Sequence, residues 1–381
     1  MPKFDLEAEL TRWRSLGQCL ERGDLVLSPF EQPIEEERRG DPDQTDDNSN
    51  FSTDNVCVLS EPRIPGNKKS IRGACVDPMF RYFLDGSIRT KYVGEYVEGR
   101  LSFPLIVSEI AVAVMERIQK SLRPSTLRKN LYFIFPHKDS GLIADTTYDR
   151  INQIRERWVR ESSLTCIEFL KRAEISGDPR FAFLGKVRSL MHDMEHEVAK
   201  SLTRSEDDWL VMDGAMRKEE FLNLPSAIGL AKSFSRKPVF SIDDALITLS
   251  AYMRTIGEGE RSAVFRKQNP SGKVERDVAF WYLRVRSYPP MEPLGGIVKI
   301  DLNVPGETVL TAEQVRLVDR ISAAVYSMRF PSVYPWPRWP SYVYPIRLAE
   351  VLMSSAFFSS YYLLQVGEEL KAATRIGQSD G

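Results

Sequence analysis

The sequence predicts a mixed α/β fold. Short apolar runs bounded by turn residues, which are typical of buried strands, alternate along the 381 residues with longer stretches whose apolar side chains recur at helical spacing. Two of the apolar runs end in an aspartate followed by a glycine. In all, these patterns predict roughly nine or ten strands and six or seven helices.

The two aspartate–glycine motifs are the candidate catalytic centre. They occupy residues 82–87 and 209–214, and each apolar run should deliver its aspartate, Asp85 or Asp213, to the C-terminal end of a strand. The glycine that follows would allow a tight turn. Carboxylates that lie far apart in the sequence can converge on one divalent cation. An ordinary turn aspartate is the alternative interpretation of each motif.

Composition and charge exclude some classes of protein. With 42% hydrophobic and 28% charged residues the chain is ordinary for a soluble globular protein, and its net charge of −1 argues against a generally basic nucleic-acid coat, although not against a local basic groove. The four cysteines form no CxxC pair, which favours reduced thiols in a cytoplasmic protein. The start has no apolar signal region, and the apolar stretch 351–366 is too short to span a bilayer, so we expect no membrane segment.

The first part of the chain should contain a helix, a linker and the start of a sheet. Apolar spacing predicts a helix over 4–22, and the acidic stretch 31–56 lacks core-forming residues and predicts a flexible linker. We therefore divide the chain into an N-terminal part, 1–60, and one large domain, 61–381. The next expected elements are strands over 80–85, 88–97 and 101–107, a helix over 110–120 and a strand over 131–135. Short connections favour an antiparallel meander, with Pro104 at an edge or a bulge.

The remainder of the chain mixes helices and strands. Residues 147–203 should form a helical insertion that is broken by a turn at Gly177. The other expected elements are strands over 210–212, 227–232, 278–285 and 296–302, helices over 242–256 and 312–328, and, after a stiff Pro- and Trp-rich segment at 331–340, a final helix that ends near residue 373.

Five short motifs follow one another in order. They are Phe83-Leu84-Asp85-Gly86-Ser87, a helical Glu195, Leu210-Val211-Met212-Asp213-Gly214, Ile228-Gly229-Leu230-Ala231-Lys232 and Tyr342-Val343-Tyr344-Pro345-Ile346-Arg347-Leu348-Ala349-Glu350. In this order they resemble the NurA nuclease family over residues 80–355. The resemblance implies an RNase H-like mixed sheet core with helical insertions, a manganese-dependent DNA nuclease, a hexameric HerA-type ATPase as partner, and a homodimer.

One position departs from the family pattern. The family's last motif ordinarily ends in alanine and histidine, whereas this sequence has Glu350 in place of the histidine. A carboxylate is a suitable ligand for a hard cation. The metal site is therefore expected either to persist with an altered metal preference or to be weakened.

The motif order indicates four metal ligands, Asp85, Glu195, Asp213 and Glu350, for Mn²⁺ or Mg²⁺. Glu195 is expected at the edge of the buried face of its helix, where a carboxylate needs a partner. The alternative is a solvated boundary glutamate, with Glu197 as the substitute ligand. Glu350 falls early in the last helix, so the alternative there is an acid favoured by the helix dipole.

Basic and aromatic residues of these motifs are further candidates. Lys232 could contact the scissile phosphate as a point charge, and Arg236 and Lys237 would continue a phosphate track. A surface lysine is the alternative for Lys232. Tyr344, together with Tyr342, could orient a water or a phosphate, or else pack in the core.

The Pro- and Trp-rich segment is a candidate for contacts with DNA bases. Trp336, Arg338 and Trp339 lie close together in the sequence and could stack on unpaired bases. The alternative is a rigid packed loop.

A competing motif points to a different enzyme. His192, Glu195 and His196 match the H-x-x-E-H signature of inverted zinc proteases, in which the two histidines share a Zn²⁺. Chance matches are frequent because only three positions are fixed, and a solvated histidine pair on the polar face of the helix is the alternative. No P-loop is present in the sequence, so we do not expect this chain to hydrolyse ATP.

The sequence therefore predicts a divalent-metal-dependent DNA nuclease. The resemblance implies an exo/endonuclease of 5′-to-3′ polarity that processes DNA ends with a HerA-like hexameric ATPase, in DNA repair or in anti-phage defence. Two alternatives stay open: a catalytically inactive DNA-clamping subunit of such a complex, and the zinc metalloprotease.

Overall fold

The computed structural model describes most of the chain. The described residues are 6–27, 56–62, 64–73, 78–161, 164–216, 223–242, 245–267, 278–287, 293–305, 309–330 and 339–376. The predicted acidic linker, except for its last residue Val56, and the predicted stacking residues Trp336 and Arg338 lie outside them.

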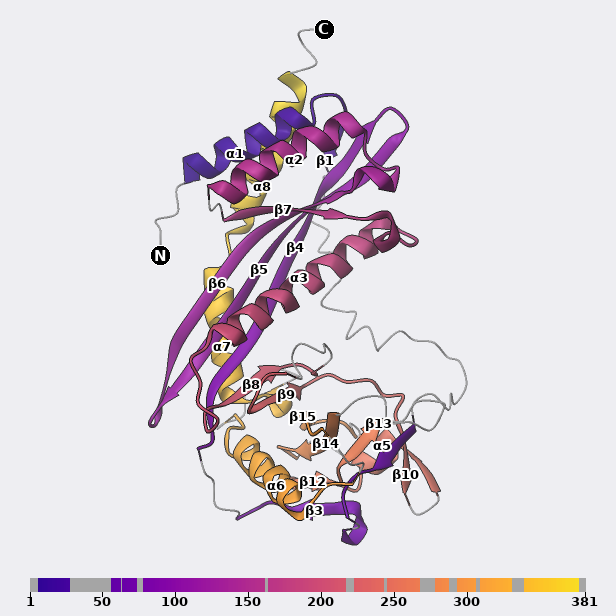
Figure 1. The fold of residues 1–381 in the computed structure, drawn as a ribbon, viewed down its shortest axis with the longest axis vertical. Coiled ribbons are helices and arrows are strands. Elements are labelled where there is room, and N and C mark those ends of the chain that lie inside the picture. Colours follow the sequence, from indigo (N-terminus) through magenta and orange to yellow (C-terminus); the bar gives the residue numbers. More distant parts are fainter. Residues whose placement is uncertain are drawn as a thin grey trace.

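One long mixed sheet forms the scaffold (Figure 1). Its described strands lie in the spatial order β11-β10-β2-β13-β14-β15-β9-β8-β4-β5-β6-β7, with β1, β3 and β12 paired beside this path. The strands are β1 (Asp24–Leu27), β2 (Val56–Leu59), β3 (Lys68–Ser70), β4 (Phe80–Glu98), β5 (Leu101–Ile118), β6 (Ser121–Pro136), β7 (Thr165–Leu170), β8 (Trp209–Asp213), β9 (Ala227–Ala231), β10 (Val239–Ile242), β11 (Ala245–Thr248), β12 (Glu260–Ser262), β13 (Phe265–Lys267), β14 (Val278–Arg284) and β15 (Ile297–Asn303).

The described helices are interspersed with these strands along the chain. They are α1 (Leu6–Cys19), α2 (Asp145–Arg160), α3 (Pro179–Ser201), α5 (Leu249–Met253), α6 (Ala312–Ser327), α7 (Tyr344–Ala356) and α8 (Ser360–Ile376), with short 3₁₀ turns η3 (Pro65–Asn67), η4 (Lys138–Ser140), η5 (Arg172–Glu174) and η6 (Trp339–Ser341). Within the described ranges, every helix is too short or too polar to span a bilayer.

Five central strands have an RNase H-like order. β4, β5 and β6 form an antiparallel meander, β8 lies parallel to β4, and β9 lies parallel to β8. A parallel neighbour requires a crossover connection, and α3 forms part of the connection between the meander and β8. The spatial order β6-β5-β4-β8-β9 is that of an RNase H-like sheet. The predicted fold class, mixed α/β with an RNase H-like core, is confirmed.

Helices cover both faces of these central strands. The face lined by Tyr82 and Leu84 packs on apolar residues of α3, whereas the face lined by Phe83 and Val211 packs on α6 and α7. Successive side chains of a strand point to opposite faces, so Asp85 belongs to the same face as Phe83. At one end of the long strands, α1, α2 and α8 gather around a separate apolar cluster (Figure 1).

The predicted strands over 80–85 and 88–97 are one continuous strand, β4, so Asp85 lies inside a strand and not at its end. Gly86 forms no turn, because it pairs with Val112 within the β4–β5 ladder. The prediction of a helix over 110–120 was also wrong, because residues 110–118 form the second half of β5. Most side chains of this segment are buried, whichever face of the sheet they lie on. It therefore lacks the alternation of a half-exposed strand, and a buried helix gives the same apolar run.

Other boundaries differ in smaller ways. The predicted helical insertion over 147–203 contains a strand, β7, between α2 and α3, and the helix predicted over 242–256 is the end of β10 followed by β11 and the short α5. The predicted last helix is divided into α7 and α8, because Phe357 has extended backbone angles. Pro104 pairs with Glu95 of β4, and β5 pairs with β6 only from Ile106 onward.

The remaining predicted elements are present with small shifts of their ends. They are the helices over 4–22 and 312–328 and the strands over 101–107, 131–135, 210–212, 227–232, 278–285 and 296–302, of which those at 101–107 and 131–135 are parts of the longer β5 and β6.

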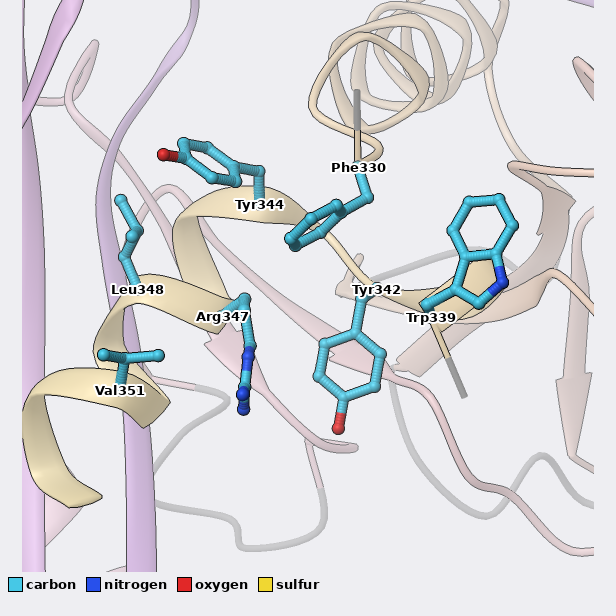
Figure 2. Close-up of a pocket in the computed structure, with 7 residues that line it drawn as sticks. All are labelled: Phe330, Trp339, Tyr342, Tyr344, Arg347, Leu348 and Val351. Atoms are coloured by element: carbon cyan, nitrogen blue, oxygen red, sulfur yellow. The ribbon is translucent and has the colours of Figure 1, made fainter. Parts of the chain in front are cut away.

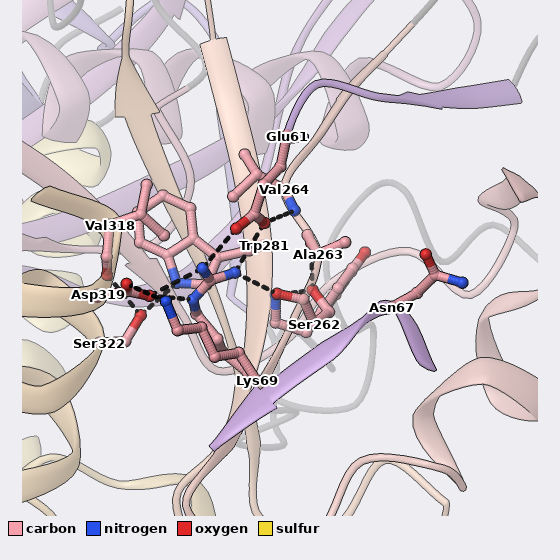
Figure 3. Close-up of polar contacts among 12 residues, drawn as sticks. Glu61, Asn67, Lys69, Ser262, Ala263, Val264, Trp281, Val318, Asp319 and Ser322 are labelled. Atoms are coloured by element: carbon pink, nitrogen blue, oxygen red, sulfur yellow. Dashed lines mark hydrogen bonds and ion pairs between the residues drawn. The ribbon is translucent and has the colours of Figure 1, made fainter. Parts of the chain in front are cut away.

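A buried ionic network fastens β12 to α6 (Figure 3). The side chain of Arg261 is fully buried, and its guanidinium donates to both carboxylate oxygens of Glu61 at 2.6 and 2.8 Å. Its Nε also donates to Asp319 Oδ1 at 2.8 Å, and Lys69 Nζ reaches the other oxygen of Asp319 at 2.6 Å. Arg261 and Glu61 are buried, Asp319 and Lys69 reach the surface, and every charge in this network has a partner of opposite sign.

Replacing Arg261 by methionine should destabilise the fold by about 3–5 kcal/mol, because the buried Glu61 carboxylate would lose its counter-charge. Denaturant unfolding measures the change. Arg128→Met is the matched control, since its ion pair with Glu197 is exposed and should contribute less than about 1 kcal/mol. Equal losses in the two variants would contradict a structural role for the buried network.

Candidate metal centre

Three carboxylates converge on the face of the sheet that α7 covers. Asp85 lies within β4, Asp213 is the last residue of β8, and Glu350 lies in the second turn of α7. The parallel register pairs Leu84 with Met212, which places the two aspartates side by side on neighbouring strands. One oxygen of each carboxylate lies within 4.8 Å of the other two. We call Asp85, Asp213 and Glu350 the carboxylate cluster.

Lys232 joins this cluster from the end of β9. Its Nζ lies 2.9 Å from Asp213 Oδ2 and 2.7 Å from Glu350 Oε1, so one cation bridges two of the three acids. The second oxygen of Glu350 accepts a bond of 2.8 Å from Arg347, one helical turn earlier on α7. The Nζ of Lys232 also lies 4.1 Å from the centroid of the Tyr342 ring.

Burial and mutual repulsion dominate the electrostatics of the cluster. Asp85 is only 5% exposed, and its pKa is raised well above the usual value, first by burial and then by the nearby charge of Asp213, while Lys232 acts in the opposite direction. Burial lowers the pKa of Lys232, but Asp213, Asp85 and Glu350 together raise it above its usual value. The site therefore favours bound positive charge.

The donor set of the cluster suits a hard divalent cation. All three groups offer carboxylate oxygens, which Mn²⁺ and Mg²⁺ prefer. Asp213 Oδ1 is buried and has no hydrogen-bond partner among the described residues, and a buried polar atom of this kind ordinarily has one. The cluster can therefore hold a divalent cation.

Glu195 lies on the other side of β4. It is buried at 6% exposure on α3, and one of its oxygens is 2.8 Å from His192 Nδ1. Its other oxygen faces Gly86, where an added Cβ would come within 2.4 Å of it. The glycine is thus needed for the close approach of Glu195 and not for a turn. Glu195 is outside the group of three that share a centre, so its role as a ligand stays a prediction.

The zinc-protease motif is not assembled as a metal site in the described part of the chain. His192 bonds to Glu195, which the protease mechanism would need as a base. No group of three candidate ligands among the described residues contains His192 or His196.

The predicted DNA-binding residues lie at different distances from the cluster along the chain. Lys232 is part of the site itself, and Arg236 and Lys237 are exposed a few residues further on. Trp339 begins η6, with the Arg286 guanidinium 5.4 Å from its ring centroid. Tyr344, the first residue of α7, is 39% exposed, which excludes simple core packing.

Sequence reasoning missed Arg347. It lies three residues before Glu350 on the same helix, and this spacing brings two side chains of a helix together. This spacing, together with the predicted metal role of Glu350, could have identified it, because a carboxylate that turns toward other carboxylates needs a nearby cation.

Comparisons with known proteins concern the fold. No protein-family model matches the sequence, and no curated protein matches it. Among solved structures, the chain is similar to the NurA nuclease from Sulfolobus solfataricus, with a TM-score of 0.37 and 11% identity over 81% of this chain and 87% of that one. It is also similar to the catalytic domain of human Endonuclease V, with a TM-score of 0.29 and 13% identity over 74% of this chain and 85% of that one. The first belongs to the family that the sequence motifs resemble. Both TM-scores are low, so the proposal of function depends on the strand order and the carboxylate cluster.

Gly86→Ala should destabilise the protein by about 1–3 kcal/mol, since the new methyl group would collide with Glu195, which is buried and bonded to His192. Urea unfolding measures the loss. Gly185→Ala is the control, because Gly185 lies within α3 with open space around it, and alanine there should be neutral or stabilise by up to about 1 kcal/mol. A neutral Gly86→Ala variant would show that the contact with Glu195 is not fixed.

Lys232→Met should lower the stability of the metal-free protein by about 3 kcal/mol, because Asp213 and Glu350 would lose the cation that they share. Added Mn²⁺ should then raise the melting temperature of this variant more than that of the wild type, since it would replace the missing charge. Lys237→Met, at an exposed position, is the control. If Mn²⁺ shifted neither wild type nor variant, the assignment of a metal site to the cluster would be wrong.

Proposed function

We propose that this protein is a divalent-metal-dependent DNA nuclease, that is, a phosphodiester hydrolase. The observation that carries the proposal is the convergence of Asp85, Asp213 and Glu350 on one face of an RNase H-like sheet. A partly buried group of carboxylates in need of positive charge is the arrangement with which proteins bind the cations of phosphoryl chemistry.

The residues of the cluster have distinct tasks in this proposal. Asp85, Asp213 and Glu350 would hold Mn²⁺ or Mg²⁺, with Glu195 as a further candidate from the α3 side. A bound divalent cation would supply activation of water and neutralise charge on the phosphodiester. Lys232 keeps the two acids it bridges together and offers a positive charge to an approaching phosphate.

Other residues of this chain would guide the DNA. Arg347 fixes the carboxylate of Glu350 through its bond of 2.8 Å. The exposed Arg236 and Lys237 lie close in sequence to Lys232 and would contact the phosphate backbone of DNA as the DNA approaches the cluster.

The biological setting of the proposed nuclease comes from its sequence motifs. Their order supports a HerA-like hexameric ATPase as partner, a homodimer, and 5′-to-3′ processing of DNA ends in the cytoplasm, in repair or in defence against phage.

A second candidate function is a DNA-clamping subunit without catalytic activity. One observation favours it: both oxygens of Glu350 already bond to cationic side chains, Lys232 and Arg347. In that case the ammonium group of Lys232 would occupy the position of a metal ion. Glu350 would then not take over the function of the histidine that the family motif has at this position.

Asp85→Asn and Asp213→Asn each remove one charge with little change of side-chain size. Each should lower Mn²⁺-dependent cleavage of linear DNA by about 100-fold or more, because the cluster would bind the cation poorly and stabilise the reacting phosphate less. Cleavage of end-labelled DNA, with and without a HerA-like ATPase, is the measurement.

Asp139→Asn is the control for these variants, since Asp139 is 67% exposed in η4 and should be dispensable. Full activity in both cluster variants would reject the site. A wild-type protein that binds DNA but never cleaves it, alone or with the ATPase, would favour the clamp.

A further inference from the structure

A small aromatic pocket opens beside the carboxylate cluster. It has a volume of about 200 Å³ and is formed where the chain leaves α6, passes through η6 and enters α7. Figure 2 shows the residues that line it, which are Phe330, Trp339, Tyr342, Tyr344, Arg347, Leu348 and Val351. Four of these side chains are aromatic and one is cationic.

The pocket presents apolar surface to solvent. Tyr344 is 39% and Val351 48% exposed, although both line the cavity. Phe330 and Tyr344 both line the pocket and pack edge to face on each other, with ring centroids 5.6 Å apart. A concave apolar surface with one charged group is typical of a ligand site and not of a core.

Two residues that line the pocket also contact the carboxylate cluster or its partner Lys232. Arg347 lines the pocket and donates to Glu350 Oε2 at 2.8 Å. The ring of Tyr342 lines the pocket and lies 4.1 Å from the Nζ of Lys232. A phosphate at the cluster would therefore have the base of its own or the next nucleotide within reach of the pocket.

We propose that this pocket binds an unpaired DNA base next to the phosphate at the carboxylate cluster, so that the preferred substrate is single-stranded DNA or an unpaired strand end. The assignment rests on the proposed function, because it takes the cluster as the place of the phosphate. Aromatic side chains stack on any base, since every base has a π face. In a duplex the neighbouring base pairs cover these faces, and a base must leave the stack before a protein pocket can receive it.

The lining also defines how selective the pocket would be. The seven described residues that line it include no carboxylate and no amide, which are the groups that read adenine and cytosine edges, and Arg347 is already bonded to Glu350. Binding would thus depend on stacking and tolerate different bases.

Tyr344→Ala tests the proposal through binding, without cleavage. Single-stranded oligonucleotides with a terminal 2-aminopurine, and blunt duplexes of the same length, are titrated with protein in Ca²⁺, and a gel checks that the DNA stays intact. Wild-type protein should quench the 2-aminopurine of the single strand. Tyr344→Ala should weaken single-strand binding about tenfold and leave duplex binding unchanged, whereas Tyr344→Phe should retain the wild-type affinity.

Tyr361→Ala is the matched control, since Tyr361 is 68% exposed on α8 and lies outside the pocket. Absence of quenching by the wild type, or an equal loss for single strand and duplex, would overturn the proposal. So would a Tyr344→Ala variant that loses only the binding of a partner protein, because the occupant would then be an apolar side chain.

The two proposals fail in different ways. A protein that quenches the base but never cleaves DNA would refute the nuclease and leave the pocket assignment intact. A protein that cleaves DNA in Mn²⁺, while Tyr344→Ala binds single strands as tightly as the wild type does, would refute the pocket alone.

Discussion

The need to balance buried negative charge governs the centre of this protein. The parallel register of β4 and β8 places Asp85 beside Asp213, and α7 adds Glu350 from the other end of the chain. Burial, and then repulsion from Asp213, raise the pKa of Asp85, so positive charge beside it favours its ionised form. Lys232 supplies part of that charge, and a divalent cation would supply more than a single ammonium group can.

The sheet makes this arrangement possible because helices cover both of its faces. α3 packs on one face of the central strands and α6 and α7 pack on the other, so the interior of β4 is shielded from water on either side. An aspartate inside such a strand is strongly desolvated, and a glycine next to it lets a second carboxylate, Glu195, approach from the opposite face. The packing that buries β4 is therefore also the main cause of the raised pKa of Asp85.

Helix α7 connects the carboxylate cluster with the aromatic pocket. Its first two turns carry Tyr344 and Arg347 on the pocket side and Glu350 on the cluster side. Arg347 belongs to both, since it lines the cavity and fixes the acid. A substrate that occupied the two sites together would be held at its phosphate and at its base, which is how an enzyme positions a reacting bond.

The sequence by itself determined the fold class and most of the strands, because apolar runs are local properties, and it predicted the acids that the structure brings together from α7, β4 and β8. It did not determine that Asp85 lies in mid-strand or that residues 110–120 form a strand, since a segment buried on both faces loses the alternation that distinguishes strand from helix. Only the tertiary structure decided that Lys232 bridges two acids, that Glu195 approaches from the opposite side of β4, and that Arg347 and the aromatic rings share a pocket. These contacts join segments more than a hundred residues apart or depend on which way a side chain turns, and no local pattern encodes either.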